Sequence, residues 1–115
     1  AEANRNVEER RAIELEDEFR TAHSRAVKIF GPYTFSLTKG GASRFNAAVF
    51  DAQMVACARL PESRFQRIRQ ESSRIQQAYR SLQNDQTYVR SVTLATSDKA
   101  ALQGRIHGIS ELLKR

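Results

Sequence analysis

Three arginines, Arg64, Arg67 and Arg74, have the type and spacing best suited to a chemical task in this 115-residue chain. They fall on one flank of a predicted helix, and guanidinium groups bind phosphate oxygens through paired N–H donors. The three side chains would then contact successive phosphates of a DNA backbone, with Gln66 and Gln70 hydrogen-bonding nearby. The alternative is that their stems cover apolar surface while the charges stay in water. The sequence leaves both interpretations open.

Residues for catalysis or metal binding do not form a recognisable set. His23 lies beside a predicted apolar stripe, His107 points away from another, and Cys57 falls in an apolar helix as a small core residue. These residues lack the ligand spacing of a zinc site. No carboxylate pair or nucleophile with an adjacent base stands out either. We therefore expect no enzyme activity, cofactor or metal within these residues.

Charge is distributed unevenly along the chain, whose net charge is +6. Seven of the thirteen acidic residues lie within the first eighteen positions. From Phe19 onward, sixteen basic residues face six acidic ones. The positive electrostatic field of this basic excess attracts phosphates or an acidic protein surface.

The length is that of one domain, and we expect a single helical domain over residues 1–115. The longest apolar-leaning stretch, Ala47 to Ala58, is interrupted by polar residues and falls well short of a membrane span. The first residues, AEANRNVEERR, have no apolar segment of a secretory signal. The expected location is therefore the cytoplasm, with no membrane contact.

Apolar residues recur at steps of three and four along most of the chain, which predicts helices over about 7–30, 44–60, 61–83 and 86–95, and a last helix reaching Leu113. The first helix ends at Gly31-Pro32. The stretch 31–43 then forms one longer connection, with Ser43 capping the second helix. The expected fold is an all-α compact bundle of about five helices.

Each predicted helix has an apolar face for the core. The inward residues expected on the first two helices are Leu15, Phe19, Ala22, Ala26, Ile29 and Phe30, then Phe45, Ala48, Val49, Ala52, Val55, Ala56 and Leu60. Those expected on the later helices are Phe65, Ile68, Ile75, Tyr79 and Leu82, then Tyr88, Val92 and Ala95, then Leu102, Ile106, Ile109, Leu112 and Leu113. Gly104 and Gly108 mark a close helix contact or, alternatively, a dimer face.

Two short motifs and a weaker third carry a family resemblance. Ile29-Phe30-Gly31 is followed by Thr34-Phe35, and Asn46 by Ala48-Val49-Phe50-Asp51-Ala52. The third, weaker motif lies near the end of the chain and consists of Leu102, Arg105, Ile109 and Leu112. Together they resemble the C-terminal helical region of the GmrSD-type family, the ParB/sulfiredoxin-like proteins of bacterial modification-dependent restriction and anti-phage systems. Arg44 departs from the proline common in that family, and the glycine-rich loop is not typical.

The resemblance implies that the chain is a C-terminal fragment of a larger protein. It would support a ParB-like, nucleotide-hydrolysing N-terminal domain and help it to contact DNA, a nuclease partner or a second copy. In that setting Asn46, in the first turn of the second helix, would tie down the preceding loop. Arg105 would pair with a helix end, so both residues would be structural. The alternative function is a helical protein-interaction or dimerisation module without nucleic-acid binding, using the acidic first helix or the glycine face.

Overall fold

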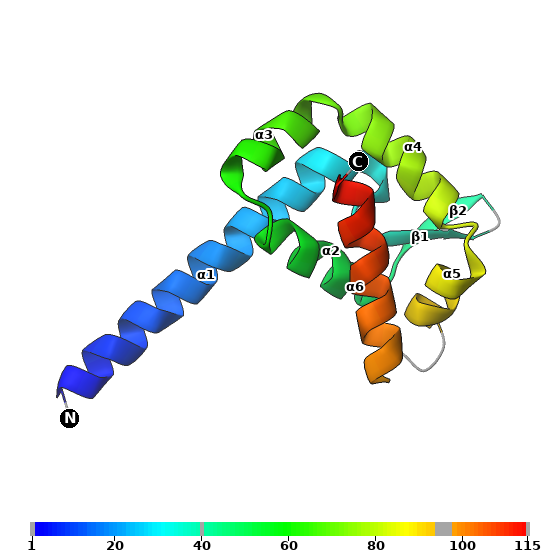
Figure 1. Ribbon diagram of the computed structural model, residues 1–115. Coiled ribbons are helices and arrows are strands. Elements are labelled where there is room, and N and C mark those ends of the chain that lie inside the picture. Colours follow the sequence, from blue (N-terminus) through cyan, green and yellow to red (C-terminus); the bar gives the residue numbers. More distant parts are fainter. Residues whose placement is uncertain (1, 40, 94–97, 115) are drawn as a thin grey trace.

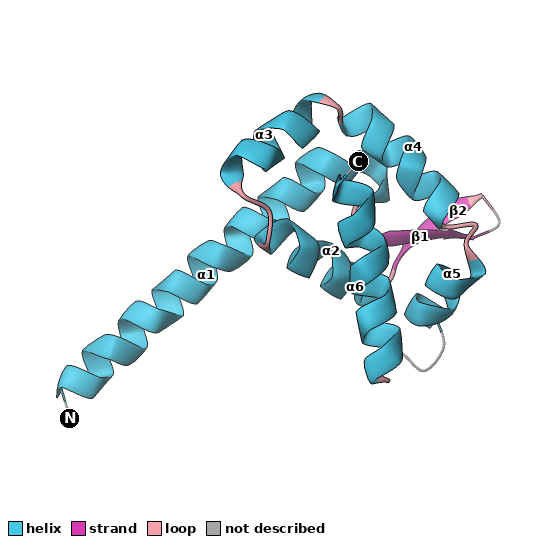
Figure 2. Cartoon of the chain, in the orientation of Figure 1, coloured by secondary structure: helices cyan, strands magenta, loops and turns pink. Residues whose placement is uncertain are grey.

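The computed structural model describes residues 2–39, 41–93 and 98–114, which form six α-helices, a 3-10 turn and a β-hairpin. The predicted all-α class is therefore confirmed, with the small hairpin as its only strand structure in the described residues (Figure 2). The elements are α1 (Glu2–Phe30), η1 (Gly31–Tyr33), β1 (Ser36–Lys39), β2 (Ala42–Phe45), α2 (Ala47–Ala58), α3 (Glu62–Gln70), α4 (Ser72–Leu82), α5 (Gln86–Thr93) and α6 (Lys99–Lys114).

The first helix ends where the sequence predicts. Gly31 has φ +52°, a left-handed conformation that glycine adopts at little cost. A side chain here would also meet an obstacle, because a Cβ on Gly31 would lie 2.7 Å from Nε2 of Gln76. Pro32 follows within η1, where its fixed φ suits a tight turn. The Gly-Pro pair thus turns the chain out of α1 and into the hairpin.

The connection after η1 is an antiparallel hairpin rather than an irregular loop. Ser36 pairs with Phe45 and Lys39 with Ala42. The prediction that Ser43 caps the second helix is wrong, since Ser43 belongs to β2. The cap is Asn46, whose Oδ1 accepts a hydrogen bond from the Val49 N–H at 3.0 Å. Helix α2 therefore begins at Ala47, and Phe45 lies outside it.

The long third helix expected over 61–83 is two helices. The break is at Glu71, whose backbone (φ −112°, ψ 28°) leaves the helical region. Ser72 and Ser73 follow directly, and serine favours helix starts over interiors because its hydroxyl competes for backbone groups. The bend lets α3 and α4 each pack against α1, and α4 also packs against α6.

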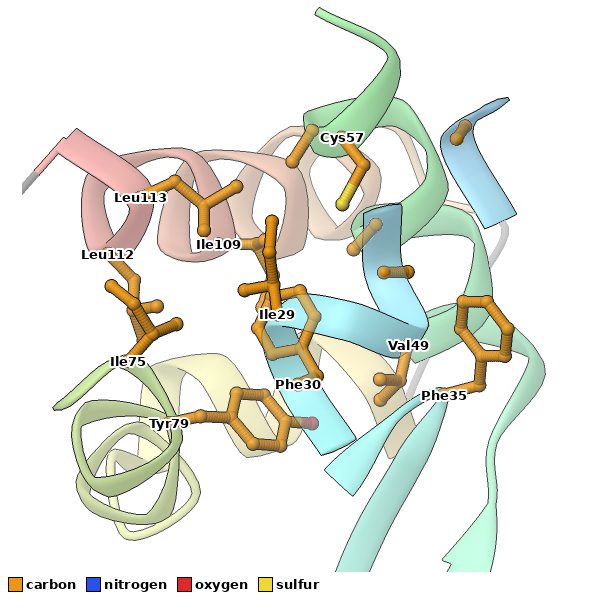
Figure 3. Close-up of a cluster of buried hydrophobic side chains, with 14 of the residues drawn as sticks. Ile29, Phe30, Phe35, Val49, Cys57, Ile75, Tyr79, Ile109, Leu112 and Leu113 are labelled. Carbon is orange, nitrogen blue, oxygen red and sulfur yellow. The ribbon is translucent and has the colours of Figure 1, made fainter. Parts of the chain in front are cut away.

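The core forms around α2 and the C-terminal part of α1. Helix α2 buries one broad face of small residues against α1 and α6, as its alanine content predicts. Figure 3 shows larger side chains of α1, α4 and α6 gathered beside α2. The fully buried members include Ile29, Phe30, Val49, Cys57, Tyr79 and Ile109.

The later helices also follow the prediction in part. In α5, Tyr88 and Val92 are buried, whereas Ala95 lies outside the described residues. In α6, Ile109, Leu112 and Leu113 are buried. Leu102 was expected to face inward but is 39% exposed, because it lies in the first turn of α6, at the edge of the bundle.

The N-terminal part of α1 projects away from the rest of the chain (Figure 1). Every residue from 6 to 21 is exposed, and we call this segment the arm. Leu15 and Phe19 were expected in the core, yet they are 48% and 51% exposed. The apolar stripe of α1 continues into the arm, but the bundle ends before it, so nothing in the described chain covers Leu15.

Candidate functional site

Four aromatic rings gather at the surface where α1, α2 and β2 meet. Phe50 is at their centre, with ring centroids 6.3 Å from Phe19 and 6.0 Å from Phe45. His23 stacks on Phe19 at 6.1 Å. We call Phe19, His23, Phe45 and Phe50 the aromatic patch. Phe45 is 67% exposed and Phe19 51%, which is unusual for large apolar side chains that both pack against the same ring, Phe50.

The patch stands on a buried ring. Phe35 is 8% exposed and lies 4.6 Å from Phe50 and 5.3 Å from His23, measured between centroids. Its backbone has φ +56°, a strained value for a non-glycine residue. Gln53 holds it there, because the buried Oε1 of Gln53 accepts a hydrogen bond from the Phe35 N–H at 2.8 Å. The rings are therefore presented by a fixed backbone.

Asn46 fixes the same region from the hairpin side. Besides capping α2, its Nδ2 donates a hydrogen bond to the Val92 carbonyl at 3.1 Å. Its backbone N–H donates to the Phe35 carbonyl at 2.9 Å. Asn46 thus lies at the cap position, one residue before the first turn that the sequence suggested. It joins the hairpin, α2 and α5 just beside Phe45.

Arg105 is buried within the bundle, at 5% exposure. Its Nη1 donates to the Ser91 carbonyl in the last turn of α5, at 3.3 Å. Its Nη2 lies 3.9 Å from the carboxylate of Asp51 on α2. The guanidinium therefore links α6 to both α5 and α2. Burial raises the pKa of the nearby Tyr88 hydroxyl to about 12, and the positive charge of Arg105 partly offsets that rise.

Arg25, in the C-terminal part of α1, is a buried cation. Its Nη1 donates to the carbonyls of Cys57 at 3.0 Å and Leu60 at 2.8 Å, and its Nη2 pairs with Glu62 at 2.7 Å. The guanidinium also lies 5.0 Å from the Phe65 ring centre. Arg25 therefore satisfies the end of α2 and ties the start of α3 to α1.

The three arginines predicted to contact DNA lie on two helices. Arg64 and Arg67 belong to α3, and Arg74 belongs to α4 beyond the break. Arg64 Nη2 donates to the Lys114 carbonyl at 2.6 Å. Arg74 pairs with Glu71 at 2.5 Å. Arg67 is exposed. The break at Glu71 thus interrupts the single flank expected from the sequence.

The glycine face of α6 is covered by the chain itself. A Cβ on Gly108 would lie 3.2 Å from Cδ2 of Tyr88, and one on Gly104 would lie 3.7 Å from Cβ of Ser91. The close helix contact expected there is therefore the packing of α5 on α6. The alternative expectation of a dimer through this face is wrong, because α5 occupies it.

Other groups with chemical potential lie apart. Cys57 is fully buried, and burial raises the pKa of its thiol to about 12. His107 is exposed on α6 and His23 belongs to the aromatic patch. In residues 2–39, 41–93 and 98–114, no three His, Cys, Asp or Glu side chains group as metal ligands would. None of the helices in that part of the chain has the length and apolar character needed to cross a membrane.

Comparison of the chain with family models, with curated proteins and with solved structures found no match.

Proposed function

We propose that this chain is a non-catalytic helical protein-interaction module whose aromatic patch binds an apolar segment of another protein. The observation that carries the proposal is the exposure of Phe19 and Phe45 on a rigid base. Exposed aromatic rings lose water favourably when a partner covers them, and aromatic residues dominate interface energies. Because Phe35 and Phe50 are already ordered beneath them, little conformational entropy is lost on binding.

The arm extends this surface along α1. Leu15, 48% exposed, lies one helical turn before Phe19 and continues the same apolar stripe. An extended or helical apolar segment of a partner would contact Leu15, Phe19 and Phe45 in turn. The resemblance to the GmrSD-type family makes a ParB-like domain, in a bacterial restriction or anti-phage system, the first partner to test.

Site-specific photo-crosslinking tests the proposal. A photoreactive phenylalanine analogue at position 45 should crosslink to one specific partner protein in cells. The matched control places the analogue at Gln70, which is exposed on α3. Equal labelling of the same proteins from both positions, or no labelling from position 45, would refute the patch as a binding site.

A DNA-backbone contact is a second candidate function. It is favoured by the excess of basic residues from Phe19 onward and by the exposed Arg67, for which the described residues include no ion-pair partner. Phosphate contact predicts affinity that falls steeply with salt. Replacing Arg64, Arg67 and Arg74 together with alanine should then weaken binding and flatten its salt dependence. If the chain binds no DNA even at low salt, this candidate fails while the aromatic-patch proposal stands.

A further inference from the structure

A groove separate from the aromatic patch lies between α2, α3 and α6, with a volume of about 380 Å³. Its apolar floor comes from these helices and the turn between α2 and α3. Its charged lining residues are all basic, and one of them, Lys114, pairs with Glu111 at 3.1 Å. The lining consists of Ala56, Leu60, Pro61 and Leu113, with Arg59, Arg64, Lys114 and Ser110 around them. Such a groove fits an apolar segment that also carries acidic side chains.

The arm has that composition. Residues 6–21 contain six acidic and three basic side chains, and they expose Val7 and Ile13 as well. Asp17 and Glu18 are exposed, and neither belongs to an ion pair in the described part of the chain. Both border a hollow whose other wall includes Leu60, and Leu60 also lines the groove. The acidic edge of the arm and the basic groove therefore adjoin in the same molecule.

Although Asp17 and Glu18 adjoin the groove of their own chain, they form no ion pair with its basic residues in the described part of the chain, and a straight α1 cannot bring them closer. Helix α1 is continuous from Glu2 to Phe30, and Ala26, Ile29 and Phe30 at its end are fully buried. Folding the arm back would require breaking the helix. Two arms are also poor partners for each other, since both carry excess negative charge. The complementary surface is thus available only on another molecule.

We propose that the arm of one copy docks through Asp17 and Glu18 against the groove of a second copy, with the reverse contact made at the same time. Since the two surfaces share Leu60 as a border, one two-fold axis brings both contacts into a single continuous interface. The arm is about 24 Å long at 1.5 Å per residue, and the two-fold axis makes each copy contribute one arm and one groove to the interface.

Charge reversal on each side tests the inference by sedimentation of the full chain. The arm variant is Asp17→Lys/Glu18→Lys, and the groove variant is Arg59→Glu/Lys114→Glu. The groove variant keeps Arg64, whose hydrogen bond goes to the backbone carbonyl of residue 114. Each variant alone should dimerise at least about tenfold more weakly than the unaltered chain. Mixed together they should form a heterodimer, because both arm-to-groove contacts again join opposite charges.

The matched control is Arg69→Glu/Arg80→Glu, which makes the same change in net charge at exposed residues outside the groove. It should dimerise like the unaltered chain, and circular dichroism should show the same helix content for all variants. A chain that is monomeric at low salt overturns the inference, as does a mixture that stays monomeric. Loss of the dimer on Phe45→Ser would move the contact to the aromatic patch and overturn the groove assignment.

Discussion

Replacing Arg25 with methionine removes the side chain that joins α1 to the α2–α3 turn while keeping most of the apolar volume. Two carbonyl acceptors, those of Cys57 and Leu60, lose a charged donor at 3.0 and 2.8 Å. The Cys57 carbonyl keeps the Leu60 N–H as a donor at 3.3 Å, whereas the partly buried Leu60 carbonyl is left without that partner, at a cost of about 1–3 kcal/mol. The lost pair with Glu62 adds little, because that carboxylate is 67% exposed and stays hydrated. We expect the free energy of unfolding to fall by about 1–3 kcal/mol.

Urea unfolding followed by circular dichroism measures this loss. The matched control is Arg20→Met on the same helix, where the arginine pairs with Glu16 at 2.5 Å in an exposed setting. That control should change stability by no more than about 0.5 kcal/mol. An Arg25→Met variant that loses no more stability than Arg20→Met would refute the assignment of Arg25 as the residue that secures the α2–α3 turn.

The remaining predictions concern α6, the buried thiol and acid stability. Gly104→Ala should stabilise the chain by up to about 1 kcal/mol. Gly108→Ala should gain less stability or lose some, because the new methyl group would lie 3.2 Å from Tyr88. Thermal unfolding of the two variants compares them directly. Cys57 should react with a thiol reagent at pH 8 only as fast as the chain unfolds, and rapid labelling of the folded chain would contradict its burial. Two hydrogen bonds lower the pKa of Glu62 from 4.5. The one from Gln66 has the larger effect and the one from Arg25 the next largest. The contribution of Glu62 to stability is therefore present above about pH 4.5 and is lost as the pH falls through the lowered pKa, so Glu62→Gln should make the stability decline less with acid.

The end of α1 and the core of α2 follow directly from the sequence. Gly31 and Pro32 leave few backbone options, and they stop the helix as predicted. The small residues of α2 recur at helical spacing and become the centre of the bundle. Both features depend on local chemistry, which a single sequence records well.

The aromatic patch was not predicted, because Phe19 and Phe45 were assigned to the core. Leu15 and Phe19 keep the spacing of the buried stripe of α1, and spacing alone does not show where the covering elements end. Phe45 was placed on a helix because the hairpin was not recognised. Gly40-Gly41 between Leu37-Thr38 and Ser43-Arg44 was the available signal for two short strands and a turn.

Arg25 and the break at Glu71 depend on tertiary structure. Arg25 lies between Ala22 and Ala26, and its partners, the carbonyls of Cys57 and Leu60, are more than thirty residues away. The stripe from Phe65 to Tyr79 continues at helical spacing across the break at Glu71. Periodicity alone does not show the bend, which lets α3 and α4 each pack on α1, and Ser72-Ser73 is the local signal beside it.

The central claim is that the aromatic patch binds a partner protein, and the affinity of the crosslinked partner tests it most directly. Phe19→Ser/Phe45→Ser should raise the dissociation constant by about 10–100-fold, as expected for two aromatic residues at an interface. The triple alanine variant of Arg64, Arg67 and Arg74 should leave it nearly unchanged. The opposite pattern, with binding lost in the arginine variant and kept in the phenylalanine variant, would contradict the account.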